Sequence, residues 1–218
     1  MLSPENIASQ PVFYLFVAAT FLLAFGYFWG RRKNRAILVD TFEELMAVIR
    51  PQEQTFTNIG GTIGYHAKFT FGKKSLYASI AATLLLLPRQ SWLYLPISLL
   101  VRKSDRLFLI VSLKQYPPAE GHLIERRYAD SWAPRITNAE RLHKERIAWG
   151  RRDFYLYSQN DHTREVLIRL MERQTEPGVL RHVAIVPNEK RCFIFLIPKP
   201  KEVAKNLVPI FEWLPAIL

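Results

Sequence analysis

The chain has 218 residues, of which 49% are hydrophobic and 13% aromatic, a composition too apolar for an intrinsically disordered protein. Its single cysteine, Cys192, excludes a fold held together by internal disulfides. The 30 Lys and Arg residues exceed the 19 Asp and Glu residues, and the formal net charge is +11. The length suits one membrane span followed by one soluble domain.

Residues 11–30 contain no charged side chain. At a rise of about 1.5 Å per residue, a helix of this length is about 30 Å long, which matches the hydrocarbon thickness of a bilayer. Tyr27 and Trp29 stand at one end, where aromatic rings favour the headgroup region. The sequence therefore predicts a transmembrane helix at 11–30, preceded by a short extracytoplasmic tail at 1–10.

A basic cluster follows the apolar segment directly and predicts its orientation. Basic flanks of membrane helices stay in the cytoplasm, so the bulk of the chain is expected there and the N-terminus outside. A cleaved signal peptide is the alternative, but residues 1–10 carry only Glu5 and no basic start. We expect a permanent single-pass anchor, with a basic juxtamembrane linker at 31–40. The topology and headgroup residues are Arg31, Arg32, Lys33 and Arg35.

Residues 41–218 are expected to form one cytosolic α+β domain with a largely antiparallel sheet and a few helices, because pairs of strand patterns are followed by helix patterns. Thr41 and Glu44 form a capping-box pattern that predicts a helix start at 41, and Asp161 is the expected cap of a later helix. Residues 130–152 are weakly patterned and are expected to form a loop or short helix. Strands are expected in 57–87 (turn at 72–74), 105–115, 122–129, 153–159, 180–187 and 191–198, and helices in 41–50, 88–103, 162–174 and 201–214.

Motifs that would carry chemistry are weak. Gly60–Gly64 lacks the Gly-Lys-Ser/Thr ending of a phosphate-binding loop and is interpreted as a bend. Glu140 and His143 form one Glu-x-x-His pair, whereas a di-metal carboxylate site needs two. Cys192 lies in an apolar strand pattern that would bury it as an inert thiol. We expect no enzyme activity, cofactor, metal or small-molecule substrate, although an enzyme with catalytic groups scattered along the chain is a third hypothesis.

Basic residues gather in the segment 121–152. Arginine predominates there, which favours bidentate contacts with phosphate. The candidate partners are anionic lipid headgroups, ribosomal RNA or a protein surface, and the ordinary alternative is a solvated charge excess that only retains topology. The candidate contact residues are Arg126, Arg127, Arg141, Lys144, Arg146, Arg151 and Arg152.

The segment 88–101 is unusually apolar for one helix of a small domain, yet Pro88 and Pro96 interrupt it and it is too short to span a bilayer. Arg89 and Lys103 bracket it. We predict a partner-facing or membrane-apposed element, with a buried core helix as the alternative. The candidate interface residues are Trp92, Tyr94, Leu95 and Leu99.

The order of these elements resembles the calumin family, coiled-coil-containing membrane proteins of the PAT complex that work beside the Sec translocon. The resemblance lies in the single anchor, in Arg89-Gln90, Ser104-Asp105 and the strand 107–113, and in 191–211 with Pro198 before a closing helix. Family members also carry an acidic region before the anchor and a C-terminal charged coiled coil. This sequence shows neither and would be a short version of the family. Ribosome contact through a coiled coil and calcium binding are therefore not carried over.

Two function classes follow from these observations. The first is a non-enzymatic accessory factor of membrane-protein biogenesis that docks its cytosolic domain on the Sec translocon or the ribosome, as the resemblance implies. The second is a structural accessory subunit of a large integral membrane complex, respiratory or photosynthetic. The aromatic-rich span and the apolar end 212–218 favour the second class.

Overall fold

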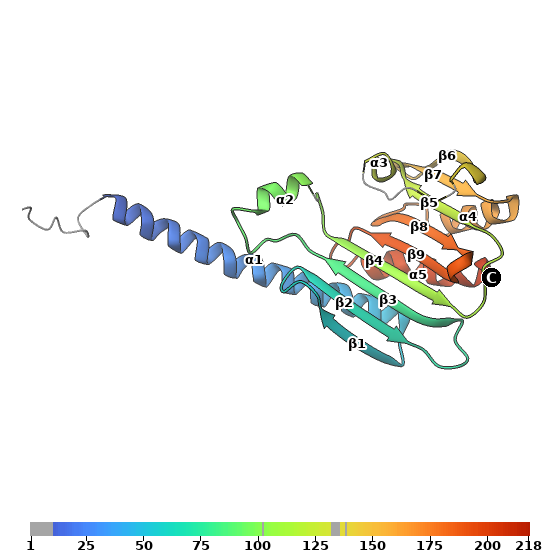
Figure 1. Ribbon diagram of the computed structural model, residues 1–218, viewed down its shortest axis with the longest axis horizontal. Coiled ribbons are helices and arrows are strands. Elements are labelled where there is room, and N and C mark those ends of the chain that lie inside the picture. The colour runs from blue at the N-terminus through green and yellow to red at the C-terminus, as the bar shows by residue number, and fades with distance from the viewer. Residues whose placement is uncertain (1–10, 102, 132–135, 138) are drawn as a thin grey trace, which may run out of the picture.

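The computed structural model describes residues 11–101, 103–131, 136–137 and 139–218 (Figure 1), so the expected tail at 1–10 lies outside the described residues. The fold is α+β. The helices are α1 (Pro11–Ile49), α2 (Leu95–Val101), α3 (Arg126–Ala129), α4 (Asp161–Arg173) and α5 (Val203–Trp213), with short 3-10 turns η2 (Ala139–Arg141), η3 (Pro187–Glu189) and η4 (Leu214–Ile217). The strands are β1 (Glu53–Asn58), β2 (Gly64–Thr70), β3 (Tyr77–Leu85), β4 (Arg106–Leu113), β5 (Gly121–Glu125), β6 (His143–Trp149), β7 (Arg152–Ser158), β8 (Leu180–Val186) and β9 (Arg191–Leu196).

Helix α1 runs unbroken through 39 residues. The expected juxtamembrane linker at 31–40 is thus helical, and the predicted helix start at Thr41 is wrong, because Thr41 is a buried residue inside α1. Residues 31–40 contain neither Gly nor Pro, and extending an existing helix costs far less than nucleating a second one. Of the described residues, α1 is the one helix long and apolar enough to cross a membrane.

One face of α1 is buried over its second half. The buried positions follow one another at intervals of mostly three or four residues, which keeps them on one side of a helix. Their first three members contact the segment after β3, and the apolar ones that follow join the hydrophobic core of the domain. The first half of α1 projects away from the domain with its apolar side chains exposed (Figure 1). The buried positions are Gly26, Gly30, Asn34, Ile37, Thr41, Phe42, Leu45 and Ile49.

The described strands form one antiparallel sheet in the order β1-β2-β3-β4-β9-β8-β5-β7-β6. The predicted turn between β2 and β3 and the predicted hairpin of β8 and β9 are confirmed. The strand β6 was expected to be a loop or short helix. Its side chains are mostly exposed on both faces because it is the edge strand, so it lacks the apolar alternation that marks a half-buried strand.

The C-terminal half of α1, α5 and α4 lie together on one face of the sheet and bury its apolar side chains (Figure 1). The N-cap of α4 is Asn160, whose side chain accepts a hydrogen bond from the Thr163 N–H at 2.8 Å, whereas the predicted cap Asp161 is the first residue of the helix. The Glu44 carboxylate of α1 accepts from the Ala204 N–H at 2.7 Å and so satisfies a free amide in the first turn of α5. These contacts fix α1 to the rest of the fold.

Candidate functional site

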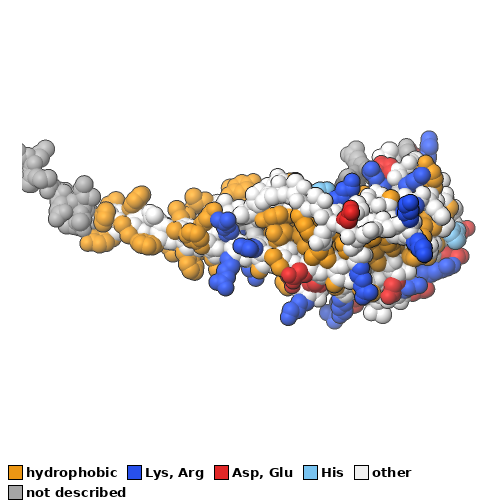
Figure 2. Space-filling model, turned by 90° about the horizontal axis from the view of Figure 1, so that it is seen from below, with side chains coloured by type: hydrophobic (Ala, Val, Ile, Leu, Met, Phe, Trp, Pro, Cys, Tyr) orange, Lys and Arg blue, Asp and Glu red, His pale blue; other side chains and the backbone are white. Residues whose placement is uncertain are grey.

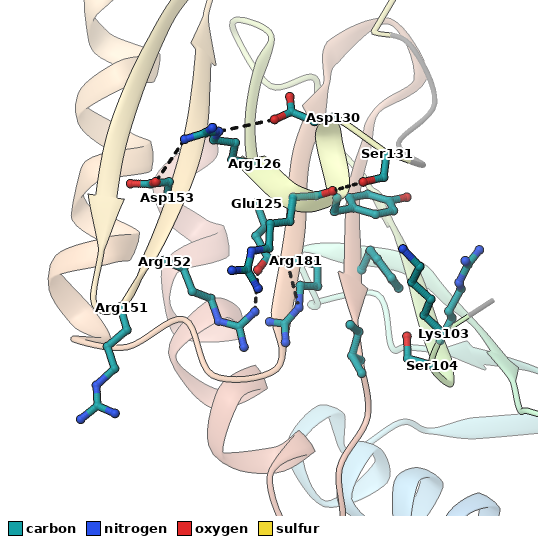
Figure 3. A pocket seen from close by; sticks show the side chains of 15 residues that line it. Lys103, Ser104, Glu125, Arg126, Asp130, Ser131, Arg151, Arg152, Asp153 and Arg181 are labelled. Atoms are coloured by element: carbon teal, nitrogen blue, oxygen red, sulfur yellow. Dashed lines mark hydrogen bonds and ion pairs between the residues drawn. The ribbon is translucent and has the colours of Figure 1, made fainter. Parts of the chain in front are cut away.

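A basic cleft of about 960 Å³ lies where five neighbouring strands end, between α3 on one side and the residues after α2 on the other (Figure 3). At the same edge of the sheet, Thr62 precedes the start of β2 and Leu87 follows the end of β3. The backbone carbonyl oxygens of both accept hydrogen bonds from Asn34 of α1. The cleft therefore faces the side of the domain from which the apolar half of α1 projects. Seven cationic side chains and three carboxylates line it. They are Lys103, Arg106, Arg126, Arg127, Arg151, Arg152 and Arg181, and Glu125, Asp130 and Asp153.

A buried ion pair forms one wall of the cleft. The side chains of Arg181 and Glu125 are only 5% and 9% exposed, and Arg181 Nε lies 3.1 Å from Glu125 Oε2. Glu125 Oε1 accepts a hydrogen bond of 2.5 Å from Arg152. Arg181 also donates to the carbonyl oxygens of Gly178 and Leu180. Burial lowers the pKa of Arg181 to about 10, so the guanidinium remains charged at neutral pH.

Four of the other cations of the cleft fall into two groups. Arg126 lies between Asp130 and Asp153, at 3.4 and 3.5 Å, and is partly neutralised by them (Figure 3). By contrast, Lys103, Arg127 and Arg151 are exposed, and none of their side chains forms an ion pair with a carboxylate among the described residues, although the Arg151 backbone N–H donates to Glu176 at 3.4 Å. These three side chains are called the open cations below. An anion in the cleft could contact them without breaking an ion pair of the fold.

The structure divides the seven basic residues that the sequence singled out. Four of them line the cleft, namely Arg126, Arg127, Arg151 and Arg152. The other three lie outside it, on η2 and β6. Lys144 Nζ stands 3.9 Å from the centre of the Tyr155 ring, Arg146 pairs with Asp153 at 2.6 Å, and Arg141 is exposed.

Sequence reasoning missed Lys103, Arg106 and Arg181 as members of this cleft. All three lie outside the segment 121–152, and the sheet alone brings them to it. A signal for Arg181 does exist, because it is the one arginine in strand β8, whose other residues are apolar apart from His182, and a buried charge needs a partner. The identity of that partner, Glu125, depends on the pairing of β5 with β8.

The apolar segment 88–101, called the α2 arm below, packs on α1 through two glycines. A Cβ atom added to Gly26 would lie 2.4 Å from ring atoms of Trp92, and one added to Gly30 would lie 2.1 Å from the Arg89 carbonyl oxygen. A larger side chain at Gly26 would displace the Trp92 ring, and one at Gly30 would displace the backbone of the arm. Regular helix covers only the last part of the arm, from Leu95, because Pro96 is confined to the first turn.

Most apolar side chains of the α2 arm are exposed, so the alternative of a core helix is excluded. Leu93 and Leu100 are 81% and 79% exposed, and among the described residues of the arm that follow Gln90 only Ser98 is buried. Leu95, one of the predicted interface residues, is half-buried. The exposed apolar side chains are Trp92, Leu93, Tyr94, Ile97, Leu99, Leu100 and Val101.

A buried polar cluster holds the base of the α2 arm against α1. Arg89 donates to both carboxylate oxygens of Asp105, at 2.9 and 2.7 Å, and to Asn34 Oδ1 at 3.0 Å. The Asn34 side-chain amide donates to the Leu87 carbonyl oxygen at 2.9 Å, and the Leu87 N–H donates to Asp105 at 2.8 Å. The arm is therefore closed at its base and fixed to one position along α1.

The basic residues that follow the apolar part of α1 lie beside this contact. Arg31, Arg32, Lys33 and Arg35 are all exposed. Figure 2 shows the apolar stretch of α1 and then a group of Lys and Arg side chains at the point where the helix reaches the body of the domain.

The weak motifs acquire structural explanations. Gly60–Gly64 forms the turn between β1 and β2. Glu140 lies in η2 and His143 in β6, so they do not share a helix face. Cys192 is buried, as predicted, and burial raises its pKa to about 12. In the described part of the chain, no three His, Cys, Asp or Glu side chains are grouped as a metal site would require.

The fold and the cleft thus define an α+β domain that carries a long apolar helix. The basic cleft lies on the side of the domain from which that helix projects. No protein-family model matches the chain, and no curated protein matches it.

Proposed function

We propose that the protein is a non-enzymatic, single-pass membrane protein that docks a cytosolic domain on a phosphate-bearing partner at the membrane surface. The setting we propose is membrane-protein biogenesis, with the ribosome at a Sec translocon as partner. The resemblance to the calumin family supports this setting. The observation that carries the proposal is the basic cleft, whose open cations face the side from which the anchor leaves the domain.

The packing of α1 supports an anchor over a cleaved leader. Gly26 and Gly30 belong to the apolar segment, and both contact the α2 arm of the domain. The same helix continues into the core at Phe42 and Leu45. Removal of residues 11–30 would expose the arm surface that the two glycines cover, which is not expected of a segment that is discarded during export.

The cationic cleft suits a polyanion because its lining carries more positive than negative charge. A Lys or Arg near an anionic surface contributes about 1 kcal/mol, and arginine binds phosphate through two parallel hydrogen bonds. The buried Arg181 is already committed to Glu125. We therefore assign the contacts with the partner to the open cations Lys103, Arg127 and Arg151.

The first prediction concerns ribosome binding by the full chain in nanodiscs of neutral phosphatidylcholine. The triple variant K103E/R127E/R151E should weaken binding by about 100-fold or more, because three favourable terms of about 1 kcal/mol each are lost. Wild-type binding should fall steeply with salt, with a log–log slope of about −0.7 to −0.9 for each phosphate contacted. Co-sedimentation through a sucrose cushion at low and high salt measures both effects.

The matched control is K68E/K73E/K74E. These three lysines are exposed on β2 and in the β2–β3 turn, and their reversal changes the net charge by the same amount. The control should bind far better than the cleft variant. Equal loss in the two variants, or no ribosome binding by the wild type at low salt, would overturn the proposal. The accessory-subunit hypothesis would then be favoured, and native purification should yield one stoichiometric integral membrane complex.

A second prediction concerns topology. If the basic residues from Arg31 to Arg35 hold the domain in the cytosol, protease added outside intact cells should leave residues 36–218 uncut. The intact mass of the purified protein should include residues 11–30. Digestion of the domain from outside would contradict the orientation, and a mass lacking 11–30 would contradict the anchor.

A further inference from the structure

We propose that the α2 arm, residues 88–101, inserts into the cytosolic leaflet and lies at the boundary between lipid headgroups and acyl chains. The proposal rests on the membrane anchor of the proposed function. It adds a second contact with lipid, which would fix the rotation and tilt of the domain and thereby the direction in which the basic cleft faces.

The first argument is the exposure of the arm. Leu93 and Leu100 are largely exposed, and five more apolar side chains of the arm are exposed beside them. Contiguous apolar surface of this kind marks a contact with a membrane or partner. The protein core does not use these side chains, so their apolar character is not explained by folding.

The second argument is continuity with the membrane helix. The arm lies against α1 at Gly26 and Gly30, which fall within the uncharged segment 11–30. The part of the arm from Arg89 to Trp92 is therefore next to a surface that lipid would already cover. This position favours lipid over a water-soluble partner as the occupant of the arm.

The third argument is depth. Gly26 precedes Arg31 by five residues, and at about 1.5 Å per residue Trp92 therefore contacts α1 about 7 Å nearer the bilayer centre than the first basic side chain. Amphipathic interfacial elements bury their apolar faces about 5–10 Å into this boundary. The depth of the Trp92 contact falls within this range.

The fourth argument is the rigid base of the arm. Asn34, Arg89 and Asp105 close it with hydrogen bonds of 2.7–3.0 Å. The exposed Arg31 and Arg32 stand on α1 directly after Gly30, which contacts the arm. Cations at this level would meet lipid phosphates when the apolar side chains enter the acyl region.

The test measures lipid exposure with nitroxide labels on the full chain, reconstituted in phosphatidylcholine vesicles. Single cysteines are introduced as L93C and L100C, at exposed positions that contribute nothing to the core. Cys192 can remain, because it is buried and its thiol is protonated at labelling pH. F21C serves as a reference within the proposed span, and Y116C serves as a water-exposed reference on the loop after β4. Collision rates with oxygen and with a water-soluble nickel complex are compared.

Positions 93 and 100 should give an oxygen-to-nickel ratio close to that of position 21 and well above that of position 116. A ratio like that of position 116 at both positions, with position 21 in lipid, would overturn the insertion of the arm and leave the anchor intact. Low collision rates with both reagents would indicate a protein cover, such as a second copy, and would also overturn it. A nickel-accessible position 21 would instead contradict the proposed anchor itself.

Discussion

Replacement of Glu125 with Ala is expected to destabilise the protein by about 3–5 kcal/mol, because it leaves the buried guanidinium of Arg181 without its carboxylate. Arg152 loses the same partner but is more exposed, so its contribution is smaller. Urea unfolding of the full chain in detergent micelles, followed by near-ultraviolet circular dichroism, measures the change.

Two further variants make this expectation specific. The double variant E125L/R181L should be more stable than E125A, because removal of both charges leaves no uncompensated ion in the interior. The control E189A breaks the pair of Glu189 with Arg191, whose side chains are about half exposed, and should cost less than about 1 kcal/mol. An E125A variant as stable as E189A would show that the buried pair does not stabilise the fold.

The cations of the cleft differ in role, because some stabilise the fold and others are available to bind a partner. Arg152 and Arg181 hold the wall of the cleft together through Glu125, whereas Lys103, Arg127 and Arg151 have no such partner among the described residues. Reversing Arg152 would therefore mix a loss of stability with a loss of binding. The open cations test binding alone.

Local patterns predicted the elements that show a clear apolar run or helical spacing. The strands β4, β8 and β9 carry apolar runs bounded by turn residues, and α4 has helical spacing after an Asn-Asp pair. The edge strand β6 escaped prediction because neither of its faces is well buried. The continuity of α1 also escaped it, since a capping box at Thr41 outweighed the absence of any helix breaker before it.

The candidate site was predicted only in part, for a different reason. Arg126-Arg127 and Arg151-Arg152 are two pairs of adjacent arginines within the segment 121–152, so the excess of positive charge can be recognised from the sequence. Arg181 reaches them only through the antiparallel pairing of β8 with β5 and of β5 with β7. Likewise, Asn34 looks like an ordinary residue in a basic stretch, and its contacts with Leu87 and Arg89 depend on how the arm folds back on α1.

The buried His182 is expected to make the protein less stable as the pH falls below neutrality. Its ring lies 5.7 Å from that of His122 and 5.2 Å from that of Phe193, and neither ring nitrogen has a hydrogen-bond partner among the described residues. Burial, and secondarily the nearby His122, lower its pKa from 6.5 to about 3. The native state therefore holds this imidazole neutral where the unfolded chain would protonate it.

The sign of the effect follows from proton uptake. Between pH 6.5 and about 3, the unfolded chain binds a proton at this position that the native protein does not bind. The free energy of unfolding should then fall by up to about 1.4 kcal/mol for each pH unit below 6.5, and His182 should add no pH dependence above about pH 7.5. Burial also lowers the pKa of His122, against the opposing effect of Glu120, so that residue acts in the same direction.

The variant H182F separates this effect from the general titration of carboxylates. Phe fills a similar volume among aromatic neighbours and cannot be protonated, so the loss of stability between pH 7.5 and 4.5 should be smaller than in the wild type. The exposed His162 provides the control, and H162Q should keep the wild-type pH dependence. Urea unfolding at pH 7.5, 5.5 and 4.5 gives the slope of the unfolding free energy against pH for the wild type, H182F and H162Q. Equal slopes for wild type and H182F would mean that His182 is protonated in the folded protein as readily as in the unfolded chain, and that the packing around it admits water or an acceptor.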